Sequence, residues 1–158
     1  MSISLASPAD FDELMALFPR LSSFEISAER NPKDLWRGDA EILRKWASGD
    51  REACFVLAER DADQGILGTA MVTMRAEPLS HFPSAHLEVL VVADGAEGRG
   101  IGGALLDAAE QEAMKRGARS MTLHVFASNH RARKVYERAG FDGEIIRYIK
   151  TFSKDALK

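Results

Sequence analysis

Glycines are concentrated in one short segment that could hold an anion. Residues 97–104 read EGRGIGGA, and they follow the apolar run 86–92 and precede a helical pattern. Glycine lets backbone N–H groups approach a ligand closely, and the N-terminus of a helix attracts negative charge. The composition and position of the segment therefore indicate a site for a phosphate-bearing ligand.

Two familiar phosphate-binding motifs do not fit this segment. The Walker loop ends in Gly-Lys-Ser or Gly-Lys-Thr, whereas the chain continues here with Gly102, Gly103 and Ala104. A G-x-G-x-x-G frame that starts at Gly98 does reach Gly103, but no acidic residue follows at the end of a second strand. A plain glycine-rich turn that binds nothing stays open as an alternative for the segment taken alone.

The cysteine and the histidines predict neither a disulfide nor a metal site. Cys54 is the only cysteine and lies within the apolar run 53–58, so we expect a small core residue. The four histidines are scattered without the paired spacing of metal ligands. We therefore assign no metal.

The first third of the chain predicts one strand and two helices. Residues 2–6 alternate polar and apolar like a short strand. Ser7 and the proline after it are typical of a helix start, and apolar residues then recur at helical spacing as far as Phe18. After an irregular stretch, a second helix is expected from Asp39 as its N-cap to Gly49 as its end.

The middle of the chain is typical of antiparallel strands. The runs 53–59 and 66–75 are separated by a polar turn that ends in glycine, which indicates a hairpin. Residues 76–84 contain two prolines and predict a loop, and 86–92 is the most continuous strand pattern in the chain.

The last third alternates helices and strands behind the glycine segment. Helices are expected over 104–116 and 129–139, each ended by a glycine. Strands are expected over 121–126 and, as a closing strand, over 145–152, and the charged end 154–158 is expected to fray.

Two segments of this half resemble the GNAT acetyltransferase superfamily. The first is Leu90-Val91-Val92 followed by the glycine segment up to Leu106, and the second is the stretch 127–141 with its Asn, Ala, Tyr and Gly-Phe. Their order and separation make the joint match specific. The resemblance implies a single α/β domain over residues 1–158, with a mixed, twisted central sheet and helices on both faces.

The resemblance also implies that acetyl-CoA is the cosubstrate. The glycine segment would hold the CoA pyrophosphate, the strand backbone would pair with the pantetheine arm, and Asn129 would contact that arm from the other side. These implied cofactor-binding residues are Leu90, Val91, Val92, Gly98, Arg99, Gly100, Ile101, Gly102, Gly103, Ala104 and Asn129. Glu97 departs from the Gln or Arg that the family usually carries at that position.

Acetyl transfer to an amine needs a general acid for the departing thiolate and a base for the amine. Tyr136 falls on the family's tyrosine position and is the expected acid. Glu88, a carboxylate in an apolar strand, is the leading candidate for the base, with His124 on the next strand and a water molecule as alternatives. The predicted activity is direct N-acetylation of a small-molecule or peptide amine. A CoA-binding or regulatory module without catalysis is the competing hypothesis.

The composition limits the classes of partner that we expect the protein to bind. The formal net charge is -3, which argues against a protein that binds nucleic acid or a membrane surface through overall positive charge. The first residues have neither a basic nor an apolar leader pattern, and no apolar run is long enough for a membrane span, so we expect a cytoplasmic protein. A homodimer is an expectation from the family resemblance alone.

Overall fold

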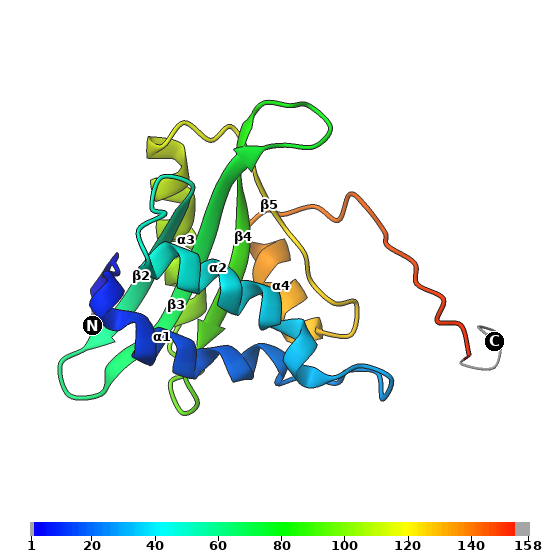
Figure 1. The fold of residues 1–158 in the computed structure, drawn as a ribbon, viewed down its shortest axis with the longest axis horizontal. Coiled ribbons are helices and arrows are strands. Elements are labelled where there is room, and N and C mark those ends of the chain that lie inside the picture. The colour runs from blue at the N-terminus through cyan, green and yellow to red at the C-terminus, as the bar shows by residue number, and fades with distance from the viewer. Residues whose placement is uncertain (1, 154–158) are drawn as a thin grey trace.

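A five-stranded sheet forms the centre of the computed structural model, which describes residues 2–153 (Figure 1). Its strands lie in the order of the chain: β1 (Ser2–Leu5), β2 (Cys54–Asp61), β3 (Gly65–Ala76), β4 (Pro83–Val92) and β5 (Met121–Leu123). The pairs from β1 to β4 are antiparallel, whereas β5 runs parallel to β4. The prediction of a mixed sheet is therefore confirmed.

The helices connect the strands. They are η1 (Pro8–Asp10), α1 (Phe11–Leu17), η2 (Phe18–Ser22), η3 (Pro32–Leu35), α2 (Arg37–Ala47), α3 (Ile101–Lys115) and α4 (His130–Arg138), where η marks a 3-10 helix. None of the helices within residues 2–153 has both the length and the apolar character needed to cross a bilayer.

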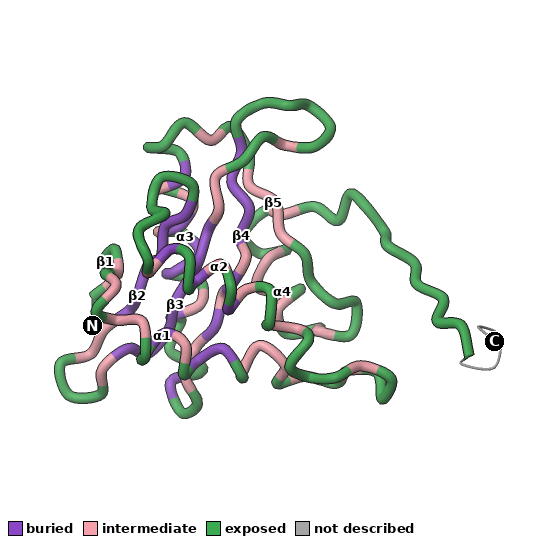
Figure 2. The backbone as a smooth tube through the Cα atoms, in the orientation of Figure 1, coloured by how far each residue is buried: buried purple, intermediate pink, exposed green. Residues whose placement is uncertain are grey.

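Helices cover both faces of the sheet, as predicted. On one face, Leu14 of α1 and Leu43 and Trp46 of α2 belong to a core with Met71 and Val89. On the other face, apolar residues of α3 form a second core with alternate residues of the same strands. Figure 2 shows the resulting burial, which is greatest along β2, β3 and β4. The alternation of side chains along the strands thus separates two cores.

Gly68 of β3 allows α3 to approach the sheet closely. A Cβ at this position would lie 3.0 Å from Leu105 Cδ1 and 3.0 Å from the Val91 carbonyl oxygen. These distances are tighter than in nine of ten real Cβ contacts, so a larger residue would require α3 or the β4 backbone to shift. The start of α3 is thereby fixed against the end of β4.

Several expected boundaries differ from the structure, and β4 already begins at Pro83, inside the expected loop 76–84. Trp36, not Asp39, occupies the N-cap position of α2, because the 3-10 turn capped by Asn31 leads directly into the helix. Helix α3 begins at Ile101, so the last glycines of the segment lie in its first turn rather than before it. The strand expected to reach residue 126 ends at Leu123, where its pairing with β4 stops.

The closing strand expected over 145–152 is wrong. This stretch has no strand conformation and extends away from the rest of the protein (Figure 1). Its apolar pattern is typical of a strand, but a strand also needs a hydrogen-bonded neighbour, and none of the described residues pairs with it. The expected frayed end, 154–158, lies outside the described residues.

Candidate active site

Strand β4 has an open edge over the second half of its length. It pairs with β5 only at Ala85, His86 and Leu87, so no described strand covers residues 88–92 on that side. An unpaired strand edge presents N–H and C=O groups that an extended molecule can bind. Leu90, Val91 and Val92, expected to bind the pantetheine arm, lie along this edge.

A bulge marks the point where β4 leaves β5. Met71 of β3 pairs with Val89 and Val72 pairs with Leu87, so Glu88 between them has no partner across the strand. A bulge bends its strand and increases the local twist. Glu88 therefore lies where the two parallel strands separate, a position that residue order alone did not predict.

The glycine segment leads into the N-terminus of α3. Gly98 and Gly100 have φ angles of 79° and 76°, in the left-handed region that favours glycine. The N–H of Ala104 donates to the Gly100 carbonyl at 3.0 Å. Within the helix, the N–H groups of Ile101, Gly102 and Gly103 therefore have no intrahelical partner, whereas that of Ala104 does.

The start of α3 and the open edge of β4 form one continuous surface. A Cβ on Gly102 would lie 3.8 Å from Val92 Cγ2, so the helix begins beside the last residue of β4. A groove of about 500 Å³ continues from there between α3 and α4. It is lined by Gly100, Gly103, Leu106, Asp107, Glu110, Val135, Arg138 and Ala139. A long ligand can thus extend from the strand edge past the helix N-terminus.

Glu97 is held between two arginines. Arg20 of η2 donates to one carboxylate oxygen, and Arg131 of α4 donates to the other at 2.8 Å. The hydrogen bond from Arg131, followed by the charges of both arginines, lowers the pKa of Glu97. Arg20 also donates from Nε to the Val92 carbonyl at 2.8 Å. Sequence reasoning missed Arg20, which lies in a stretch expected to be irregular and far along the chain from both partners.

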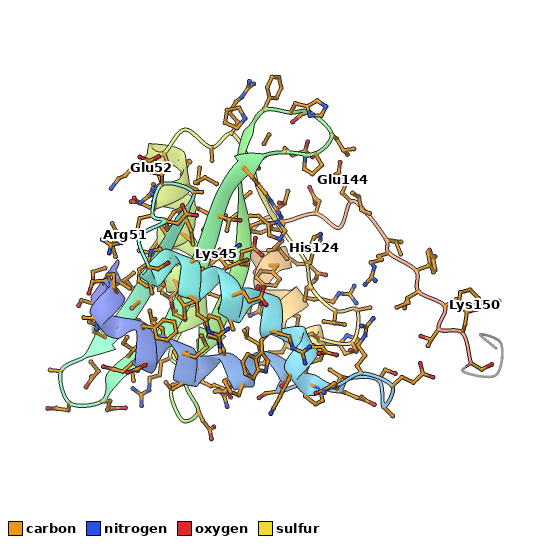
Figure 3. The ribbon with its side chains drawn as sticks, in the orientation of Figure 1. Lys45, Arg51, Glu52, His124, Glu144 and Lys150 are labelled. Atoms are coloured by element: carbon orange, nitrogen blue, oxygen red, sulfur yellow. The ribbon has the colours of Figure 1, made fainter. Side chains whose placement is uncertain are left out.

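We expect Glu97→Gln to strengthen acetyl-CoA binding. Removing the carboxylate leaves Arg20 and Arg131 available to an anionic ligand, so the Kd should fall by roughly threefold at low salt and by less at high salt. Isothermal titration at two salt concentrations measures this change. Glu52→Gln, which removes the same charge from the loop before β2 (Figure 3), is the control. Weaker binding by Glu97→Gln would mean that Glu97 orients the arginines.

Tyr136 lies on the α3 side of the sheet, on α4. It packs against that core, and its ring meets the Phe141 ring edge-on with centroids 6.1 Å apart. Burial raises the pKa of Tyr136 to about 12. The hydroxyl therefore keeps its proton at neutral pH and is able to donate it.

Asn129 occupies the N-cap of α4, as expected. Its side-chain oxygen accepts a hydrogen bond from the Ala132 N–H at 3.3 Å. The amide nitrogen of the same side chain remains a donor. The contact with a pantetheine arm stays a prediction.

The leading base candidate, Glu88, lies on the opposite, α2 side of the sheet. The Thr73 hydroxyl donates to Glu88 Oε1 at 2.7 Å, and Thr73 pairs across the strands with Cys54 and His86. Thr73 and Glu88 therefore share the face on which Cys54 joins the core formed with α1 and α2. The bulge thus directs the Glu88 carboxylate away from the Tyr136 side.

Two histidines extend this polar cluster toward β5. His86 is buried, its Nδ1 lies 2.7 Å from Thr122 Oγ1, and its ring centroid is 4.8 Å from that of His124. Burial, then the charges of Arg75 and His124, lowers the pKa of His86 to about 4, so this ring is neutral at working pH. His124 is exposed just past the end of β5 (Figure 3), outside the strand in which it was expected.

Asp39 also belongs to the site, although the sequence predicted only that it caps a helix. Burial, followed by the charge of Glu88, raises the pKa of Asp39 to about 7. Two carboxylates from α2 and β4 therefore face the same region. No local pattern predicts this, because it depends on where α2 begins.

We expect Asp39→Asn to stabilise the fold at alkaline pH. The raised pKa means that between about pH 4 and 7 the unfolded chain loses the Asp39 proton while the folded chain keeps it, so wild-type stability falls across this window and stays lower above it. Asparagine removes that loss, worth about 1 kcal/mol at pH 8. Urea unfolding at pH 4, 5.5 and 8 measures it, with Asp63→Asn in the β2–β3 turn as the control. If the free energy of unfolding of Asp39→Asn varied with pH in the same way as that of the wild type, the raised pKa of Asp39 would be contradicted.

Cys54 is the remaining reactive side chain near this cluster. Although distant from both motifs in sequence, it is brought close to Glu88 by the pairing of β2 with β3. The thiol is buried, and burial, with the charge of Glu88, raises its pKa to about 12. It therefore stays protonated, which argues against a covalent cysteine intermediate.

Comparisons with known proteins agree with this geometry. The model of the Acetyltransferase (GNAT) family matches residues 13–141 of the chain. This chain belongs to the GNAT acetyltransferase family. The resemblance predicted from the two motifs is therefore confirmed, and with it the GNAT fold. Strands β2 to β5, the helix after the glycine segment and α4 all lie within the matched range.

This GNAT protein is similar to a curated enzyme and to several solved structures. A mycothiol acetyltransferase from Renibacterium salmoninarum is 30% identical over 141 residues, which are 89% of this chain and 40% of that protein. The chain thus spans less than half the length of that relative. A protein from Bacillus halodurans shares the fold with a TM-score of 0.76 and 19% identity, covering 97% of this chain and 100% of that one.

A second solved structure extends the fold comparison. The ribosomal-protein-alanine N-acetyltransferase of Brucella melitensis biovar Abortus has a TM-score of 0.67 and 20% identity, covering 96% of this chain and 100% of that one. At this identity the likeness concerns the fold alone.

Proposed function

We propose that this GNAT protein transfers the acetyl group of acetyl-CoA directly to a primary amine. The observation that supports it best is the open edge of β4, which starts at the Glu88 bulge and ends beside the N-terminus of α3. That surface offers first a strand edge and then free N–H groups. Acetyl-CoA has the matching order, an extended pantetheine arm followed by a pyrophosphate.

The residues of this surface suit the parts of acetyl-CoA. The N–H groups of Ile101, Gly102 and Gly103 would hold the pyrophosphate, and Arg131 of α4, which is bound to Glu97, would add a positive charge. The backbone of residues 90–92 would pair with the pantetheine arm, apart from the Val92 carbonyl, which accepts from Arg20. Bound acetyl-CoA supplies the thioester whose acetyl group is transferred.

The acid and the base lie on opposite faces of the sheet, on either side of the gap between β4 and β5. Tyr136 belongs to the α3 side and Glu88 is held by Thr73 on the α2 side. Glu88 would accept the proton of the amine, and Tyr136 would give its proton to the departing sulfur. This separation keeps the two proton transfers apart. His124, beside neutral His86, or a water molecule is the alternative base.

The acceptor is proposed to be a cationic amine that enters from the α2 side. Asp39 and Glu88 place two carboxylates there. A groove of about 190 Å³ between α2 and the strands is lined by residues that include Lys45, Asp50 and Thr73. Small molecules and peptide ends both fit this description.

Two measurements test the function. Isothermal titration with acetyl-CoA should show binding, and its absence at millimolar ligand would contradict both the enzyme and the CoA-binding module. Thiol release in a panel of polyamines, aminoglycosides, amino acids and peptides then separates these two. Release with at least one amine class supports the enzyme, whereas binding without release across the panel supports the module.

A further inference from the structure

The segment 144–152 exposes large apolar side chains that a free tail would not be expected to carry. The exposed fractions are 74% for Ile145, 77% for Ile146, 88% for Tyr148, 61% for Ile149 and 64% for Phe152. Figure 2 shows this stretch as exposed along its whole length. Contiguous apolar surface of this kind marks an interaction site.

The arrangement of these residues is that of a central strand. Side chains of an extended chain alternate between two faces, so Ile145 and Ile149 lie on one face and Ile146, Tyr148 and Phe152 on the other. A strand at the surface of a sheet needs only one apolar face. Two apolar faces indicate that the segment is covered on both sides when it is paired.

The sheet offers a matching edge at β5. Within residues 2–153, β5 pairs with β4 on one side and with no strand on the other. Met121 and Leu123 are partly buried against the α3 core, and Val125 and Phe126 just beyond them are exposed. The outer side of β5 is therefore an apolar edge with free backbone groups, distinct from the β4 edge assigned to acetyl-CoA.

The chain does not bring its own segment to this edge. Phe141 is anchored against Tyr136, and after Glu144 the chain runs away from the body, with Lys150 near the outer end of the described stretch (Figures 1 and 3). None of the hydrogen bonds or ion pairs of residues 2–153 involves a residue of 144–152. Nine extended residues span about 30 Å, enough to cross to a second molecule.

We propose that residues 144–152 add as a strand to the outer edge of β5 of a second copy of this chain, which returns its own segment in the same way. Each copy carries both the donor segment and the acceptor edge, so the exchange closes as a twofold dimer. Ten large apolar side chains with about 100 Å² of buryable surface each contribute about 1,000 Å². With the receiving surfaces included, this reaches the size of a stable interface.

The test uses the full chain in solution. Sedimentation should give twice the chain mass of 17.4 kDa. Hydrogen exchange of the amides in 144–152 should be slowed at least about 100-fold relative to an unstructured peptide. A monomer, with or without protected amides, would overturn the proposal, since protection in a monomer means pairing with the chain's own edge. A dimer with unprotected amides would overturn it as well.

A pair of variants distinguishes a dimer formed by exchange of residues 144–152 from a dimer formed through another surface. Ile146→Asp changes a side chain that is 77% exposed in the single chain, and Leu79→Asp in the β3–β4 loop changes one that is 66% exposed. Exchange predicts that Ile146→Asp raises the dimer dissociation constant at least about tenfold and that Leu79→Asp leaves it unchanged. Equal effects of the two variants, or a dimer that Ile146→Asp does not weaken, would overturn the proposal.

Discussion

Replacing Tyr136 by phenylalanine should lower kcat by about 100-fold and leave the Kd for acetyl-CoA within about twofold of the wild type. The variant keeps the ring that packs against Phe141 and the α3 core, and it loses only the hydroxyl. Cofactor binding therefore persists while the proton for the departing sulfur is missing. Steady-state kinetics with the best amine of the panel, together with titration of acetyl-CoA, measures both quantities.

The other tyrosine of the chain is a matched control. Tyr148 is 88% exposed on the extended segment, so Tyr148→Phe removes the same hydroxyl away from the site. It should leave kcat unchanged. Because the pKa of Tyr136 is about 12, the wild-type enzyme should also show no loss of activity from this group below about pH 11. A Tyr136→Phe enzyme with wild-type kcat would remove the proposed acid.

Glu88→Gln should lower kcat/KM at pH 7 by about 30-fold, the second large effect. Glutamine retains an oxygen that can accept the hydrogen bond from Thr73, so the bulge should keep its shape. Without a base, only amine that is already neutral reacts. The rate of the variant should then rise with pH up to the pKa of the amine, about 10.4 for a lysine-like acceptor. Profiles of kcat/KM from pH 6 to 10 measure this.

His124→Gln, assayed over the same range, assigns the base between the two candidates. Glu88 as base predicts that the profile of His124→Gln matches the wild type. An altered profile for His124→Gln together with a wild-type profile for Glu88→Gln would identify His124 as the base. Two unaltered profiles would contradict both and leave water as the proton acceptor.

The features predicted correctly from sequence are those encoded locally. Glycines at positive φ and a following helical repeat predicted the loop and α3, and Asn129 predicted the start of α4, because each signal acts within a few residues. The apolar runs and the turns between them likewise predicted strands β2, β3 and β4. The mixed sheet with helices on both faces followed from the family resemblance. The GNAT family followed from the order of these local signals.

The features that were missed depend on which strands or helices meet. The bulge at Glu88 is set by the register between β3 and β4, and the apolar run around it shows no interruption. Arg20 reaches Glu97 and Val92 from a 3-10 helix across the fold. Asp39 turns toward Glu88 because α2 begins earlier than its cap signal indicated. None of these contacts has a signature in neighbouring residues.

The closing strand was wrong for a related reason. Residues 145–152 have the composition of a strand, but composition does not say which edge receives it. The proposed exchange would supply that edge from another copy, which a single chain cannot indicate.

The buried, protonated thiol of Cys54 affects how the activity of the protein can be assayed. Chromogenic disulfide reagents react with thiolates, and a thiol with a pKa of about 12 is ionised in about one molecule in 10⁵ at pH 7. The side chain is also only 5% exposed. Such a reagent, added to native protein, should therefore record newly formed coenzyme A against almost no background, and a slow rise of colour without substrate would report unfolding of the chain.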